Sequence, residues 1–215
     1  MGLNMIIEYL GHSAFLIKGE KSVVLDPFKS IGYDMQKVTC DYCISSHNHF
    51  DHNAFDRVNC SKIAAQADGA TPVGFEGINL SRIKTYHDDK MGKLRGDNYV
   101  SVFSIDGVTF AHFGDLGEAD NQQLIAALNG VDVLFIPVGG TYTIDALAAK
   151  NYCQRIKPKI IIPMHFKTEK STVDIAPIEE FLKLFDDYKK VENPINFNIN
   201  QYTYPQILVF DHTKF

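Results

Sequence analysis

The stretch Ser45-Ser46-His47-Asn48-His49-Phe50-Asp51-His52 determines how the rest of this chain is interpreted. Three histidines and an aspartate stand within six residues, just after the apolar run 42–44, which is typical of a strand. Imidazole and carboxylate groups are common ligands of zinc-like metal ions. A regular strand would put His52 on the opposite face from the other three, so a loop at the end of a strand is favoured. The alternative is a solvated polar loop, but the density of ligand types predicts a metal site.

Length and composition indicate one ordinary globular domain spanning residues 1–215, with 45% hydrophobic and 22% charged residues. The net charge of −5 gives no basic surface for nucleic acid, although it does not exclude an anionic small-molecule substrate. No apolar run approaches the roughly 20 residues that cross a bilayer, and the N-terminus lacks a signal-peptide pattern. We therefore expect no membrane partner and a cytoplasmic location. Self-association into a homo-oligomer is expected only on base rates.

The four cysteines are too few for a disulfide scaffold in a chain of this length. Cys40 and Cys43 have the spacing of half a zinc knuckle, but the chain has no second C-x-x-C pair to complete it. Free thiols are therefore the expected state of these residues, and a cysteine metal site is the alternative.

Two kinds of pattern follow one another along the chain. Up to residue 113 short β-rich runs predict strands at 5–10, 14–18, 22–25, 42–45, 63–67, 73–75, 79–86, 99–105 and 108–113. Further on, helices predicted at 121–128, 145–155 and 178–189 alternate with apolar runs at 133–138, 159–163 and 206–210. This order predicts an α+β fold, a four-layer αββα sandwich of two mixed β-sheets with helices over both outer faces.

Ligand-type residues recur where the predicted strands end, at Asp26, His87, Asp115 and His165. Loops at one edge of a sheet sandwich converge, so side chains that leave the strands there can meet. Each residue alone is weak evidence, because an isolated strand-end histidine or aspartate is more often structural or solvated. Together with the loop at 47–52 they complete two coordination shells.

The order of these motifs resembles that of metallo-β-lactamase-fold hydrolases over nearly the whole chain. The matching motifs are Asp26, the loop His47–His52, His87, Asp115 in Gly-Asp-Leu-Gly, and His165 in Pro-Met-His-Phe. Within that superfamily, Leu10-Gly11-His12-Ser13 and Tyr86-His87-Asp88-Asp89 are most similar to a bacterial subgroup of metal-dependent hydrolases. That subgroup includes ascorbate-6-phosphate lactonase-like proteins, and the superfamily motif specifies fold and metal rather than substrate.

The resemblance implies a ligand set for two divalent metal ions. One ion is held by His47, His49 and His87, the other by Asp51, His52 and His165, and Asp115 bridges them. Asp51 and Asp115 are then the catalytic candidates. A metal-activated hydroxide would attack a small lactone, ester or phosphoester. Zinc is the expected metal, with manganese or iron as alternatives.

Two other functions of this fold are alternatives to that expectation, and two more are disfavoured. A phosphodiesterase or nuclease-type hydrolase is the first alternative, although neither an inserted domain nor a basic arm is visible. A non-catalytic metal-binding module is the second, but no expected ligand is missing. His49 stands where di-iron redox relatives carry glutamate, and Asp115 where true β-lactamases typically carry cysteine, so both of those activities are disfavoured.

Three further residues near the site are not part of the implied ligand set. Asp26 is interpreted as orienting a ligand histidine through its free ring N–H, and an Asp-Pro turn cap is the alternative. His12 either lines the pocket or caps a turn. His112 is expected to be a core or supporting histidine rather than a ligand.

Substrate contacts are expected from two loops. The turn 139–145 contains Tyr142 and Thr143, and its backbone N–H groups could bind an anion at the start of a helix. An ordinary capped turn is the alternative. Arg95, in the loop after His87, could supply positive charge to a phosphate or carboxylate group.

Overall fold

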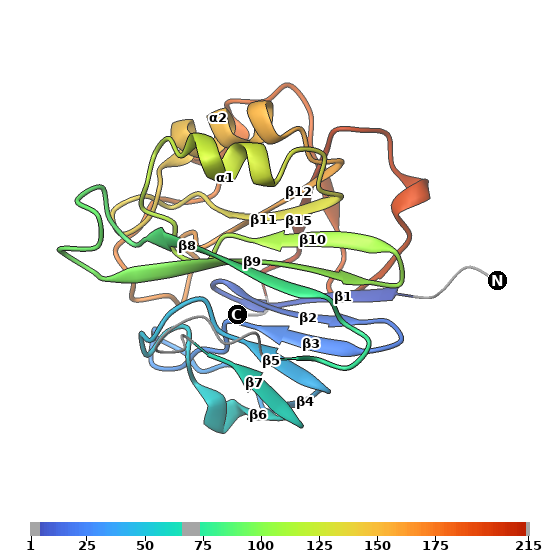
Figure 1. Ribbon diagram of the computed structural model, residues 1–215. Helices are drawn as coiled ribbons and strands as arrows, with labels where there is room; N and C mark the ends of the chain where they lie inside the picture. Colours follow the sequence, from blue (N-terminus) through green and yellow to red (C-terminus); the bar gives the residue numbers. More distant parts are fainter. Residues whose placement is uncertain (1–4, 66–73, 214–215) are drawn as a thin grey trace.

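Two mixed β-sheets pack face to face in the computed structural model, which describes residues 5–65 and 74–213 (Figure 1). The six-stranded sheet has the order β14 (Ile195–Phe197), β1 (Met5–Gly11), β2 (Ala14–Lys18), β3 (Ser22–Leu25), β5 (Tyr42–Ile44), β7 (Lys62–Ala64). The seven-stranded sheet has the order β13 (Lys189–Val191), β15 (Gln206–Phe210), β12 (Ile160–Met164), β11 (Val133–Pro137), β10 (Val108–His112), β9 (Asp97–Ile105), β8 (Leu80–Tyr86). A small sheet pairs β4 (Val38–Thr39) with β6 (Val58–Asn59).

Strands of the six-stranded sheet are apolar on both faces because both faces are covered. Ile7 and Phe15 belong to the core between the two sheets, whereas Leu16 and Val24 belong to a second core on the outer face. Phe28, in the segment that follows β3, is fully buried in that second core. The continuous apolar runs of β1 to β3 follow from this double burial.

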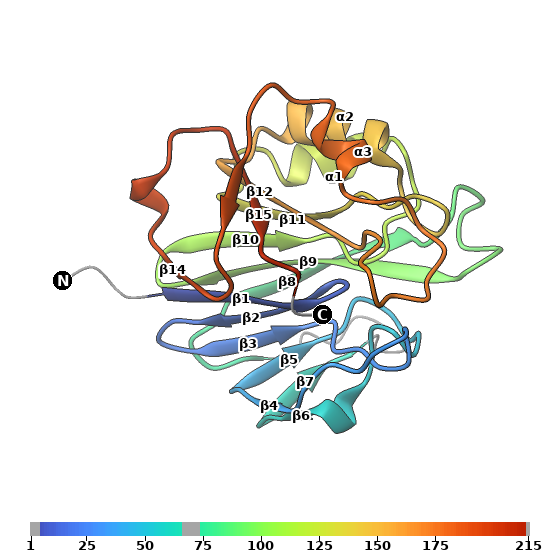
Figure 2. The ribbon, with the colours of Figure 1, turned by 180° about the vertical axis from the view of Figure 1, so that it is seen from behind.

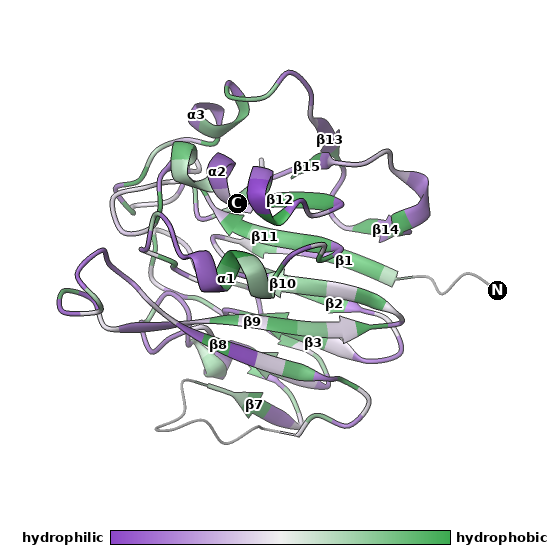
Figure 3. Ribbon diagram, turned by 45° about the horizontal axis from the view of Figure 1, so that its top comes forward, coloured by the Kyte–Doolittle hydropathy of each residue, from purple (hydrophilic) through white to green (hydrophobic). Residues whose placement is uncertain are grey.

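Helices cover one outer face in the described residues (Figures 1 and 2). α1 (Gln122–Ala127), α2 (Ala146–Ile156) and α3 (Glu179–Leu182) lie over the seven-stranded sheet. Figure 3 shows hydrophilic stretches on α1 and α2 and largely hydrophobic central strands beneath them. The outer face of the six-stranded sheet is instead covered by irregular segments, the β4–β6 pair and the short 3-10 helix η1 (Phe55–Arg57). A second 3-10 turn, η2 (Ile199–Gln201), precedes β15.

The predicted α+β sandwich of two mixed β-sheets is confirmed, but the strands β4, β6, β13 and β14 are not among those predicted, and the helices differ in two ways. Helices were expected over both outer faces, and the described helices lie over only one. The helix predicted at 178–189 spans only Glu179–Leu182, and Lys189, its last predicted residue, instead begins β13, which pairs in parallel with β15. The predicted strands at 63–67 and 73–75 fall partly outside the described residues. In the described part of the chain no helix is long and apolar enough to cross a membrane.

Strand direction brings the predicted ligands to one edge. β1 and β3 are both antiparallel to β2, and β5 is parallel to β3, so these three strands end at the same edge of their sheet. In the other sheet β10, β11 and β12 are parallel, and β8 shares their direction through the antiparallel strand β9. The loops after β1, β3, β5, β8, β10 and β12 therefore converge. These six loops carry every metal-site residue predicted from the sequence.

Candidate metal centre

One carboxylate oxygen lies at the centre of the converging loops. Asp115 Oδ2 is 3.2 Å from His52 Nε2 and 3.3 Å from both His87 Nε2 and His165 Nε2. His47 Nε2 lies 4.0 Å from the same oxygen. A single buried oxygen is thus in reach of four imidazoles from three different segments.

The surrounding ligand-type side chains form two groups. His47, His49 and His87 offer nitrogens that all lie within 4.8 Å of one another, and we call them the open group because His49 is only partly buried. His12, His52 and His165 do the same and are all buried, and we call them the closed group. Asp51 joins the closed group, with Oδ2 3.9 Å from His52 Nε2.

Asp26 orients a histidine in each group. Its Oδ2 accepts hydrogen bonds from His52 Nδ1 at 2.7 Å and from Ser46 Oγ at 2.6 Å. Ser46 Oγ in turn lies 2.9 Å from His47 Nδ1 and can accept a hydrogen bond from it. Both rings therefore have Nδ1 engaged behind them and Nε2 directed into the site, the arrangement that supports metal-binding histidines.

Tight backbone turns place several of these side chains. Asp26 and His165 have φ values of 42° and 52°, a left-handed conformation that is costly for non-glycine residues and is concentrated at functional sites. Gly114, with φ 54°, precedes Asp115, and a Cβ there would lie 2.3 Å from Ser46 Cβ. Only glycine lets β10 end this close to the loop that carries the histidines.

Electrostatics in the site match metal ligation. Burial alone would raise the pKa of Asp115, but His165 and His52 outweigh it and hold the pKa well below its usual value. Burial lowers the pKa of His47 well below its usual value. Burial would also lower the pKa of His52, yet Asp115 and Asp51 outweigh it and raise that pKa well above the usual value. A cation bound beside His52 would therefore displace a proton.

The donor atoms fit divalent cations. Five buried polar atoms in the site have no hydrogen-bond partner: His12 Nε2, His52 Nε2, His87 Nδ1, Asp115 Oδ1 and His165 Nδ1. Leaving so many buried polar atoms unpaired would be costly unless something else satisfies them. Nitrogen and carboxylate donors separated by 3–4 Å are what a cation with short ligand bonds requires.

Of the three predicted substrate-contact residues, two line a cavity and one does not. Arg95 and Tyr142 line a cavity of about 550 Å³ that also contains Asp51 and Asp115. Thr143 is not among the lining residues, and its hydroxyl donates to the Ile144 carbonyl at 3.1 Å.

Two further features concern the turn 139–145, where the alternative was a capped turn, and His112, which was expected to be a supporting residue. The Asp145 carboxylate accepts the Ala148 N–H at 2.8 Å, so the turn 139–145 has the helix cap that the alternative describes. His112 uses both ring nitrogens: Nε2 donates to the Ser13 carbonyl, and Nδ1 accepts from Gly114 N–H. It is therefore a supporting core residue.

Three positioning residues are not among the predicted site residues, although Ser46 and Asp88 lie within the quoted motifs. Ser46 bridges Asp26 and His47, as described above. Asn98 is fully buried, and its amide accepts the Asp115 N–H at 3.0 Å and donates to the Phe113 carbonyl. Asp88 accepts four backbone N–H groups from the loop that follows it, including that of Arg95. Asn98 could have been found from the sequence because it lies two residues before the buried Val100 in one strand, so its polar side chain points to the same buried face.

The fold and the site together define a hydrolase of the metallo-β-lactamase superfamily. A sequence model of the β-lactamase superfamily domain matches residues 6–165, and the chain belongs to this superfamily. A UPF0173 metal-dependent hydrolase of Carboxydothermus hydrogenoformans is 33% identical over 199 residues, covering 76% of this chain and 85% of the relative. A second, from Pyrococcus abyssi, is 27% identical and covers 86% and 94%.

A solved structure gives the same class. A chain from Thermotoga maritima, described as a Zn-dependent hydrolase of the metallo-β-lactamase superfamily, superposes with a TM-score of 0.77 at 32% identity. The superposition covers 96% of this chain and 98% of that one. The protein is accordingly an enzyme, a metal-dependent hydrolase.

Proposed function

We propose that the protein is a dinuclear hydrolase whose two divalent cations occupy the open and closed groups and share Asp115. The observation that carries the proposal is the position of Asp115 Oδ2, within 3.3 Å of His87 in one group and of His52 and His165 in the other. Such a cation pair, when bound, supplies a nucleophile at neutral pH and polarises the bond to be broken. Zinc is the expected metal, because nitrogen-rich donor sets suit it, with manganese or iron as alternatives.

The chain's own residues have separate tasks in this proposal. Asp115 and Asp51 hold the cations and contribute negative charge beside the cavity. Asp26 keeps His47 and His52 in the ring orientation that presents Nε2. Burial at 1–2% exposure of His47 and Asp115 excludes water from the rear of the site, which strengthens electrostatic interactions there.

The substrate we propose is a small lactone, ester or phosphoester with an anionic group. A cavity of about 550 Å³ is of the size that encloses a small molecule. Arg95 is half-buried on the cavity wall, with its guanidinium 5.3 Å from the Tyr142 ring centroid. No carboxylate in the described part of the chain forms an ion pair with this guanidinium. The four N–H bonds to Asp88 fix the loop, so the charge is preorganised for an anion.

The test combines metal analysis with hydrolysis assays of the wild type and His49→Ala. We expect about two equivalents of metal in the wild type, about one in the variant, and loss of hydrolysis of bis-p-nitrophenyl phosphate or a small lactone panel in the variant. Stoichiometric metal without any hydrolysis would favour the non-catalytic module. No metal, even after reconstitution, would overturn the proposal.

The anionic subsite has its own readout in the same assays. Arg95→Ala should raise KM for an anionic ester while leaving kcat nearly unchanged, and should not affect the uncharged ester of the same size. Lys93→Ala, an exposed cation in the same loop, is the matched control. Equal effects on both esters would contradict the role of Arg95.

A further inference from the structure

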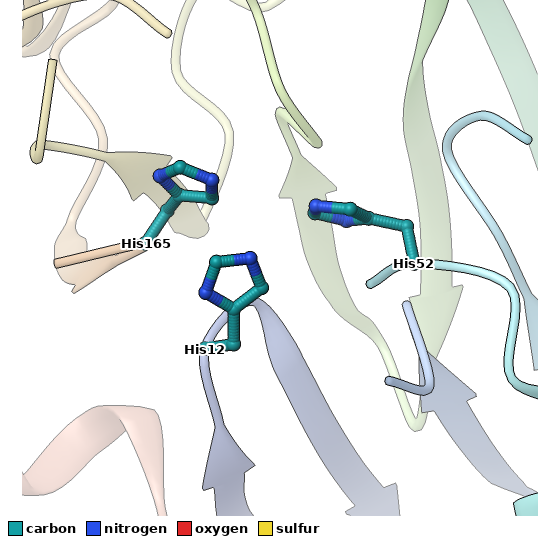
Figure 4. Close-up of side chains that lie close together, drawn as sticks. All are labelled: His12, His52 and His165. Carbon is teal, nitrogen blue, oxygen red and sulfur yellow. The ribbon is translucent and has the colours of Figure 1, made fainter. Parts of the chain in front are cut away.

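His12 carries a buried imidazole nitrogen that the ligand set above does not use. It lies in the turn between β1 and β2, is 2% exposed, and its Nε2 has no hydrogen-bond partner. Its ring centroid is 4.3 Å from that of His165 and 5.2 Å from that of His52. Figure 4 shows the three rings gathered around one point, each coming from a different segment of the chain.

The distance to Asp51 distinguishes two roles for this nitrogen. His12 Nε2 lies 3.5 Å from Asp51 Oδ2. A hydrogen bond from an imidazole to a carboxylate is shorter, at about 2.7–2.9 Å. Two donors bound to one cation through bonds of about 2.0–2.2 Å stand about 3–4 Å apart. The observed separation suits two ligands of one cation better than a hydrogen-bonded pair.

The backbone fixes His12 against the other sheet. Its carbonyl accepts hydrogen bonds from the Tyr9 hydroxyl at 2.9 Å and from His165 N–H at 3.0 Å. The residue has φ 52°, a left-handed conformation that a histidine seldom adopts. A positive φ suits a two-residue hairpin loop, and the hydrogen bond from His165 N–H ties this loop to a segment that carries a predicted ligand.

We propose that His12 is a metal ligand of the closed group. The cation there would have five protein donors, namely His12, Asp51, His52, His165 and Asp115. This inference rests on the proposed dinuclear site. A fifth donor exceeds the four that zinc prefers in structural sites, so it favours a cation of higher coordination number in this group and leaves the more open position to the other cation.

The experiment measures metal binding, without relying on turnover. Metal-free wild type, His12→Asn and His212→Asn are each titrated with Zn²⁺ and, separately, with Mn²⁺ by calorimetry. Asparagine tolerates the left-handed conformation at position 12. His212, which contacts the Phe166 ring outside the site, controls for loss of a nearby imidazole. Equal thermal midpoints of the metal-free proteins establish that His12→Asn folds.

We expect His12→Asn to lose more than about 100-fold in affinity for one equivalent and to keep the other, since loss of a supporting residue costs only about 10–100-fold. The His212→Asn protein should bind as the wild type does. Binding of both equivalents by His12→Asn within threefold of the wild type would overturn the proposal.

A crystal structure of the metal-loaded wild type decides between the two roles directly. The proposal requires His12 Nε2 at about 2.0–2.3 Å from the cation, and a separation beyond about 3 Å overturns it whatever the loss of affinity. A wild type that binds one equivalent would instead refute the dinuclear proposal, and the same distance would still decide the role of His12.

Discussion

Two regions of this molecule gather metal-ligand side chains, and only one has the properties of a metal site. The first is the centre around Asp115. The second, which we call the thiol cluster, consists of Cys40, Cys43 and Cys60 on the outer face of the six-stranded sheet. Within the described residues, none of the side-chain groups able to hold a cation includes a cysteine.

Protonation separates the two regions. Burial, together with the nearby Cys60, raises the pKa of the Cys40 thiol to about 12, and Cys40 Sγ donates to the Tyr42 carbonyl at 3.0 Å. Burial likewise raises the pKa of Cys43 well above its usual value. At Asp115 the neighbouring histidines produce the opposite shift and keep the carboxylate ionised.

Proximity of ligand types is therefore not sufficient for a site. A metal ligand must be deprotonated, and no other hydrogen-bond partner should occupy its lone pair. The thiols keep their protons and pack as small hydrophobic groups. In the centre, His12 Nε2 and His52 Nε2 are buried and unpaired, and Asp26 lies behind His52 directly and behind His47 through Ser46.

The largest effect is expected from Asp115→Ala, which removes the group shared by both halves of the centre. We expect metal content to fall below one equivalent and hydrolysis to drop by more than about 100-fold, because a lost ligand costs more than a lost supporting residue. Elemental analysis and the lactone assay measure the two effects. Cys43→Ala, at an equally buried ligand-type residue, should retain its metal. Equal metal loss in both variants would remove the distinction between the regions.

A smaller effect is expected from Asp26→Asn. The amide cannot hold His52 and, through Ser46, His47 as strongly, so affinity for both cations should fall by about 10–100-fold. Metal titration followed by calorimetry measures this loss. Asp41→Asn removes a carboxylate that accepts two hydrogen bonds from Ser22, remote from the centre, and should leave the affinities unchanged. Affinities within twofold of the wild type in Asp26→Asn would show that the carboxylate does not orient the rings.

The sequence predicts the strands well where apolar runs end at strong turn signals. The strands 14–18, 22–25 and 206–210 coincide with β2, β3 and β15. The helix predicted at 178–189 is too long, and pairing of β13 with β15 accounts for its last residue, Lys189. A three-residue strand with two exposed lysines has no pattern that distinguishes it from the end of a helix.

For the site as well, the sequence predicts some features and leaves others open. The loop 47–52 stands out because several ligand types occupy adjacent positions, and the strand-end rule adds the more distant ligands. The connection between Asp26 and His52 spans 26 residues and depends on how β3 and β5 pair, which spacing alone does not determine. The alternatives for His12 stay open in the sequence because its contact with His165 crosses from one sheet to the other.

The smallest effect concerns the thiol cluster and the pH dependence of stability. Between the usual thiol pKa of 9.0 and about 12, the unfolded chain loses the Cys40 proton while the folded chain keeps it. The unfolded state then binds fewer protons, so the free energy of unfolding falls as pH rises above 9 and is unaffected by this group at lower pH. Thermal midpoints from pH 7 to about pH 10 should therefore decline less in Cys40→Ala than in the wild type.

The same variant also tests the contrast between the two regions. If Cys40 is a protonated packing residue, Cys40→Ala keeps its metal at neutral pH and loses only part of the alkaline slope in stability. Metal loss in Cys40→Ala would mean that the thiol cluster binds a cation despite its buried protons. Parallel slopes in the two proteins would mean that the thiol has the same pKa in the folded and unfolded states, and the raised pKa of the buried thiol would then be wrong.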